Sequence, residues 1–149
     1  MNETVNTRVI FGAVKKSGKR RNINGVLTYD EEIINIGSGM DIRSGEFKVP
    51  EEGFYSFSFS GTAFDDDAEL GISVNVVKNG AEMFDFDDFN SKKGSYESGP
   101  DYQWRSLSGQ WMAKLNKGDT IHLHVDTGYL STDNGQRIYF TGQLLLKSD

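Results

Sequence analysis

Two histidines are the first candidates for chemistry in this sequence. His122 and His124 lie two residues apart in an alternating segment, so a β-strand would place both side chains on one face. A two-histidine zinc site would need a third ligand from elsewhere in the chain. The alternative is a solvent-facing pair opposite the core positions Ile121 and Leu123. Motifs of serine hydrolases, zinc proteases and phosphate-binding loops are absent from the sequence, and we expect no enzymatic activity.

Two acidic segments are candidates for a cation site. The first follows Phe64 and contains four acidic residues: Asp65, Asp66, Asp67 and Glu69. Adjacent carboxylates of this kind more often form a solvated turn than converge on one ion. The second segment, FDFDD, contains three more: Asp85, Asp87 and Asp88. Hard cations such as calcium prefer carboxylate oxygens, but they need carboxylates that converge from a folded loop.

A polar and aromatic segment, residues 86–106, is the strongest candidate for ligand binding. We expect it to form a long loop, because its aromatic residues follow no strand alternation. The rings of Tyr96, Tyr102 and Trp104 can stack on a sugar or anchor a protein interface, and Arg105 can pair with a carboxylate. The sequence therefore predicts a ligand site at these four residues. The alternative is a loop that packs on itself or is buried between subunits.

A second expected loop, residues 15–25, is strongly basic. It carries five of the sixteen basic residues: Lys15, Lys16, Lys19, Arg20 and Arg21. A run of this kind can bind anionic glycans or lipopolysaccharide, and the alternative is a solvated loop without a ligand. The spacing of the residues does not separate these two interpretations.

The elements that must position these residues are β-strands. Tyr55, Phe57 and Phe59 alternate with serines, which predicts one apolar and one polar strand face. The same period recurs in residues 72–77, 111–115 and 121–126, and a final strand is expected in 139–147. No segment has the period of a helix. We expect an antiparallel sandwich or barrel whose inner wall contains the three aromatic rings, with turns at Gly45 and Gly53 and a strand end at Pro50.

Length and composition exclude several classes of protein. The 149 residues fit one domain, expected over residues 8–147 with a flexible segment at 1–7. The net charge of −6 argues against a nucleic-acid partner, and no apolar run is long enough to insert into a membrane. The chain has no cysteine, and no signal peptide is visible at its start.

Six segments appear in an order that identifies a known family. They are FGA, LTYDEEIINIG, DIRSGEFKVPEEGFYSF, VKNG, SGQWMAKLNKGD and FTGQLL, and they run from residue 11 to residue 145. In this order the chain resembles the globular head domain of complement component 1q, within the tumour necrosis factor-like superfamily. The resemblance implies an all-β antiparallel jelly-roll β-sandwich that assembles as a homotrimer. It also implies a secreted, extracellular and non-enzymatic protein, and because no collagen stalk precedes Phe11 we expect a free-standing head.

The resemblance also bears on calcium and on the ligand. Relatives hold calcium near the trimer apex, and Asp87 matches the first ligand position, whereas Arg105 occupies the second, where a guanidinium would repel a cation. The apical calcium site is therefore not expected here. Calcium binding at a shifted place near Asp85 stays open, with Asp87 and Asp88 as the candidate ligands. We predict lectin-like pattern recognition of glycans or microbial surface components in innate immunity. The alternative is a protein–protein interaction module that engages a cell-surface receptor.

Overall fold

The computed structural model describes residues 8–16, 23–65, 71–89 and 103–148. Within these ranges it is built of β-strands, with one 3-10 turn, η1 (Asp133–Gly135). The strands are β1 (Ile10–Lys15), β2 (Ile23–Val26), β3 (Glu31–Ile36), β4 (Met40–Asp41), β5 (Glu46–Lys48), β6 (Gly53–Asp65), β7 (Gly71–Lys78), β8 (Ala81–Phe89), β9 (Gln103–Leu115), β10 (Thr120–Ser131) and β11 (Ile138–Lys147). Within the same ranges, no helix is long and apolar enough to cross a membrane.

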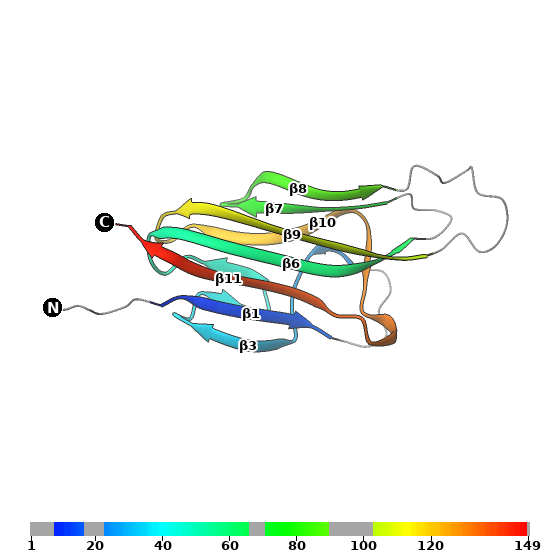
Figure 1. Ribbon diagram of the computed structural model, residues 1–149, viewed down its shortest axis with the longest axis horizontal. Helices are drawn as coiled ribbons and strands as arrows, with labels where there is room; N and C mark the ends of the chain where they lie inside the picture. The colour runs from blue at the N-terminus through cyan, green and yellow to red at the C-terminus, as the bar shows by residue number, and fades with distance from the viewer. Residues whose placement is uncertain (1–7, 17–22, 66–70, 90–102, 149) are drawn as a thin grey trace.

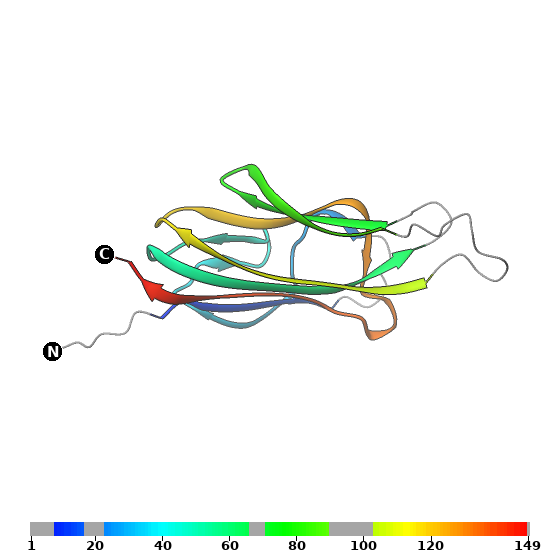
Figure 2. The same ribbon diagram turned by 45° about the horizontal axis from the view of Figure 1, so that its top comes forward.

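The strands form two layers (Figures 1 and 2). The first sheet has the order β3-β1-β11-β6-β9, and all its pairings are antiparallel. The second sheet centres on β10, which pairs with β7 along one side and with β2 and β5 along the other, while β8 pairs with β7 and β4 with β5. The end of β10 also pairs with β6, so the two sheets join at one side. This arrangement confirms the predicted jelly-roll sandwich.

The predicted aromatic wall lies between the two sheets. Tyr55, Phe57 and Phe59 are almost fully buried, whereas the alternating serines of β6 point away from the core. The ring of Phe57 stacks on Trp111 with centroids 5.1 Å apart, and the ring of Phe47 meets it edge-on at 6.0 Å. Contacts of this kind add to the free energy gained by burying the rings, so these aromatics stabilise the fold.

Two glycines predicted in turns have different roles. Gly45 has a φ of 79°, in the left-handed region, and a Cβ there would collide with the carbonyl of Leu27. Gly53 was predicted in a turn, and this prediction was wrong, because Gly53 begins β6. A Cβ at Gly53 would meet the backbone oxygen of Leu146, so close packing of β6 on β11 requires glycine there. Pro50 lies between β5 and β6, as expected for a residue without an amide donor.

Both predicted loop ranges include residues that the structure places in strands. β8 continues to Phe89 and β9 begins at Gln103, so both ends of the expected loop 86–106 are strand. β6 extends thirteen residues and offers backbone partners up to Asp65, which pairs with Gln103. Similarly, Lys15 belongs to β1, and residues 23–25 belong to β2. Ladder hydrogen bonds can hold polar residues in a strand that shows no apolar alternation, and the prediction from periodicity missed this.

Candidate functional site

Exposed apolar side chains are concentrated on the first sheet. Among the described residues, eight of the ten large exposed apolar residues belong to its strands. They are Ile33, Ile34 and Ile36 of β3, Phe54 of β6, Met112 of β9, and Tyr139, Leu145 and Leu146 of β11. We call this surface the assembly face. Met112 is 72% exposed and Leu146 is 62% exposed, and exposed apolar side chains grouped on one face mark a candidate contact surface.

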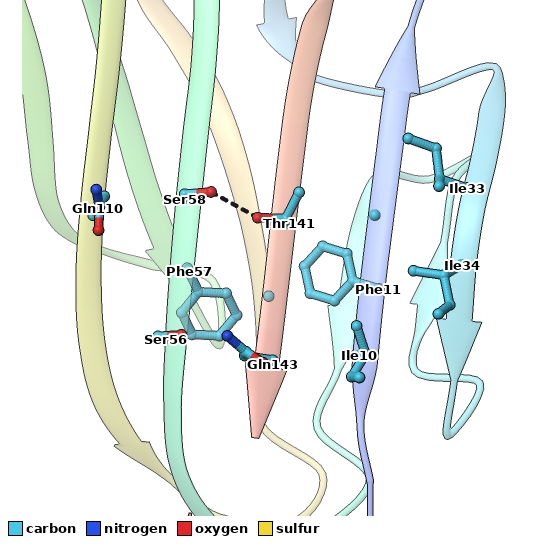
Figure 3. Close-up of a pocket in the computed structure, with 12 residues that line it drawn as sticks. Ile10, Phe11, Ile33, Ile34, Ser56, Phe57, Ser58, Gln110, Thr141 and Gln143 are labelled. Carbon is cyan, nitrogen blue, oxygen red and sulfur yellow. Dashed lines mark hydrogen bonds between the residues drawn. The ribbon is translucent and has the colours of Figure 1, made fainter. Parts of the chain in front are cut away.

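A groove of about 480 Å³ runs across the assembly face. Its floor includes the backbone of Gly12, and a Cβ added there would lie 3.6 Å from Ile33. Figure 3 shows Ile33 and Ile34 on one side of the groove, with Ser58 and Thr141 on the other. The two hydroxyls hydrogen-bond to each other at 2.6 Å. One wall is therefore apolar and the other is neutral and polar, which suits a protein surface better than a charged small molecule.

The two edges of the first sheet are β3 and β9. Among the described strands, β9 pairs only with β6, and β3 pairs only with β1. An edge strand exposes a row of unpaired backbone groups, and native proteins cover or interrupt such edges. The pairing of β3 with β1 shifts register at Gly12 and Ala13, which interrupts one edge. β9 is thirteen residues long and carries the exposed Met112, so the described strands leave a long unpaired edge beside an exposed apolar side chain.

The predicted ligand residues are only partly placed. Tyr96 and Tyr102 lie outside the described residues. Trp104 and Arg105 belong to β9, where their backbones pair with Phe64 and Ala63, so they are not loop residues. Their side chains lie outside the description. The structure therefore places Trp104 and Arg105 at the start of β9, and their role as ligand contacts stays a prediction.

The predicted metal residues lie at the end of β8. Asp87 is exposed and pairs in register with Ser73, and Asp88 pairs with Ile72. The side chain of Asp88 lies outside the description, and of the first acidic segment only Asp65, the last residue of β6, has a described backbone. No group of three histidine or acidic side chains is close enough to hold a metal ion within the described ranges. A calcium site at Asp87 and Asp88 stays a prediction.

The histidine pair lies on the outward face of the second sheet. Ile121 and Leu123 are buried, which confirms the predicted alternation, but His122 and His124 are half-buried instead of fully exposed. β7 flanks β10 on one side, with β2 and β5 on the other, and neighbouring side chains shield the imidazoles. This burial lowers the pKa of His122; Glu46 opposes the shift and His124 adds to it. A third zinc ligand is not found among the described residues.

The assembly face was missed at the sequence level. The signal was present in two places: the run IINI at residues 33–36, which follows three acidic residues, and Met112 in the alternating segment around Trp111. Trp111 and Met112 cannot both point to the core of a regular strand, so one of them must face outward. Only the strand order shows that the outward positions of β3, β11, β6 and β9 share one surface.

The fold and this surface define a jelly-roll β-sandwich with an exposed apolar face on one sheet. The sequence matches the C1q domain family over residues 10–145, so the chain belongs to that family. It is 29% identical over 127 residues to complement C1q tumor necrosis factor-related protein 3 of Mus musculus and of Homo sapiens, covering 85% of this chain and 47% of each relative. The chain thus spans about half the length of these curated relatives.

A solved structure gives the same fold. The globular domain of the zebrafish complement 1qA protein superposes with a TM-score of 0.70 and 18% identity, covering 94% of this chain and 99% of that domain. Members of the C1q domain family are non-enzymatic recognition or signalling proteins. Their globular heads typically form trimers and bind protein or other ligands.

Proposed function

We propose that this chain is the homotrimeric, non-enzymatic ligand-recognition head of a secreted protein. The observation that carries the proposal is the concentration of exposed apolar side chains on one sheet. Burying such side chains against another protein surface gains roughly 1.5–3 kcal/mol each when burial is complete. The two ends of this face differ in shape: a groove lies near β3, and the exposed side chain of Met112 projects from β9. A groove on one copy and a protrusion on the next can make a head-to-tail contact, and a rotation of 120° between copies would close three of them into a ring.

The ligand class that we propose is a glycan or another repetitive microbial surface component. A trimer presents three copies of each ligand site on one rigid body, so weak single contacts combine into strong binding to a repetitive surface. Trp104 and Arg105, at the start of β9, are the proposed contacts within the described backbone. An indole ring can stack on a sugar ring, and a guanidinium can bind a carboxylate such as that of an acidic sugar. A cell-surface receptor protein is the competing ligand class.

Two measurements test the proposal. Sedimentation velocity should give three times the 16.6 kDa chain mass, and a monomer at micromolar concentration would refute the assembly. Binding to a glycan array should survive EDTA and should be lost in Trp104→Ala and Arg105→Ala but retained in the control Lys114→Ala, which alters an exposed residue of the same strand. Capture of a receptor protein without glycan binding at any density would assign the head to the competing class.

A further inference from the structure

On the outward face of the second sheet, two polar residues of β7 lie opposite two acidic residues of β8. Ile72, Val74 and Val76 of β7 are buried in the core, so the residues between them, Ser73 and Asn75, point away from it. The antiparallel register places Asp87 opposite Ser73 and Asp85 opposite Asn75. We call these four residues the outer site: Ser73, Asn75, Asp85 and Asp87. It lies on the layer opposite the assembly face (Figure 2), so assembly through that face leaves it uncovered. Its two carboxylates are exposed, whereas Ser73 is 5% and Asn75 is 8% exposed.

Asn75 is the residue of the outer site that points to a ligand. Its side chain is only 8% exposed although it faces away from the core, and its Oδ1 atom is buried without a hydrogen-bond partner in the described part of the chain. Buried acceptors are nearly always paired in native proteins, so an unpaired one calls for an explanation. No described residue satisfies this acceptor, and a hydrogen-bond donor from a bound ligand would do so.

The two carboxylates of the outer site have no oppositely charged partner among the described side chains. Asp85 and Asp87 are exposed, and neither forms an ion pair with a described residue. Across β7, the register places His124 beside Asn75 and Thr127 beside Ser73, so β10 adds no lysine or arginine. The site therefore combines two negative charges, an amide oxygen and a hydroxyl, and lacks a positively charged group from the strands that border it. Its chemistry calls for a ligand that is cationic and rich in hydrogen-bond donors.

The geometry favours an organic cation over a metal ion. Calcium takes six to eight oxygen ligands that converge from a folded loop, whereas this site offers two carboxylates on a flat strand pair. Three acidic or histidine side chains do not converge anywhere in the described ranges. A guanidinium is planar, carries five donors in a fixed fork and pairs well with carboxylates on a flat surface. We propose that the outer site binds the guanidinium of an arginine in a partner protein, with Asp85 and Asp87 as the anionic contacts and Asn75 Oδ1 as an additional acceptor.

This site goes beyond the proposed glycan recognition and does not depend on trimerisation. The net charge of −6 agrees with a basic partner segment, because opposite charges speed encounter and select the partner. Exposed Val26 and Met83 lie on the same sheet as the outer site, and apolar contacts there would add affinity around the arginine. The carboxylates of Asp85 and Asp87 would then fix the position of the partner segment on this sheet.

The test is an NMR titration of the uniformly ¹⁵N-labelled full chain with N-acetyl-arginine methylamide. We expect saturable shifts of the backbone amides of residues 73–75 and 85–87 and of the side-chain amide of Asn75. N-acetyl-citrulline methylamide, which has the same shape without the charge, should bind at least about tenfold more weakly. The double variant Asp85→Asn, Asp87→Asn should weaken arginine binding about tenfold. Asn75→Val should reduce the preference for the arginine probe over N-acetyl-lysine methylamide.

The control variant is Glu82→Gln, which removes one exposed acidic charge of β8 outside the site. It should change arginine binding less than about threefold, as expected for a screened surface charge. Equal binding of the arginine and citrulline probes would overturn the proposal, as would unchanged binding in the double variant. Calcium chloride that shifts the same resonances at micromolar concentration and displaces the arginine probe would replace the proposal with a metal site. None of these outcomes depends on trimer formation or glycan binding, which are measured separately.

Discussion

The substitution Met112→Ser tests the assembly face directly. Met112 lies on β9 and is 72% exposed in the protomer, so it contributes little to the core. Full burial of a methionine side chain is worth roughly 1.5–3 kcal/mol, and burying the exposed 72% of it in an interface gains about 1–2 kcal/mol. Three symmetric contacts would then contribute about 3–6 kcal/mol to a trimer. Since each 1.4 kcal/mol changes an equilibrium constant about tenfold, the serine variant should raise the trimer dissociation constant by roughly two to four orders of magnitude.

The measurement is sedimentation equilibrium from nanomolar to micromolar protein, with circular dichroism to verify folding. The matched control is Met83→Ser, because Met83 is also an exposed methionine, at 40%, but lies on β8 of the second sheet. The control should assemble like the unmodified chain. A Met112→Ser protein that stays trimeric over the whole range would refute the reasoning. So would dissociation of the Met83→Ser control, because the interface would then include the other layer.

Three further substitutions test the core and the pH response. Gly142→Ala should lower the free energy of unfolding by roughly 1–3 kcal/mol in urea, because the new Cβ would collide with the Phe11 ring and lie 2.8 Å from the Phe57 ring; an unchanged midpoint would contradict this packing. Tyr55→Phe should cost about 1 kcal/mol by calorimetry, because the hydroxyl donates a 2.6 Å hydrogen bond to a backbone oxygen, and a neutral result would show that water replaces it. The pKa of His122 is lowered from 6.5 by burial, so the unfolded chain takes up its proton at higher pH and stability should fall as the pH drops below 6.5. His122→Gln should flatten this slope in urea titrations between pH 7.5 and about pH 5, and an identical slope would refute the assignment.

The core could be predicted from residue alternation alone. The aromatic wall of β6 and the apolar positions of β10 follow a strict period of two, and each predicted inward residue is buried. Such a pattern determines which residues face the core, because shifting a strand by one residue would expose every apolar side chain. The family could also be predicted, since its marker residues occupy turns and close backbone approaches such as Gly45.

Strand ends and the lateral neighbours of a residue could not be predicted in the same way. Trp104 and Arg105 lack an apolar period, and β6 holds them in a strand by backbone hydrogen bonds, which local sequence does not report. The half-buried state of His122 depends on flanking strands that lie far from it in the sequence. The outer site needed the register of β7 on β8, since nothing in either segment states that Asn75 lies opposite Asp85.

The sequence by itself determined which side of each strand faces the core, because burial of apolar surface is a local choice repeated every second residue. It also excluded a disulfide framework and a basic nucleic-acid surface, since both depend on composition. Only the tertiary structure decided what the outward positions do. The strand order brings isoleucines from β3 and Met112 from β9 onto one surface, and it brings Asn75 and two carboxylates onto the other. The physical reason is that strands far apart in the sequence pair with each other, and this pairing decides which outward side chains share a surface.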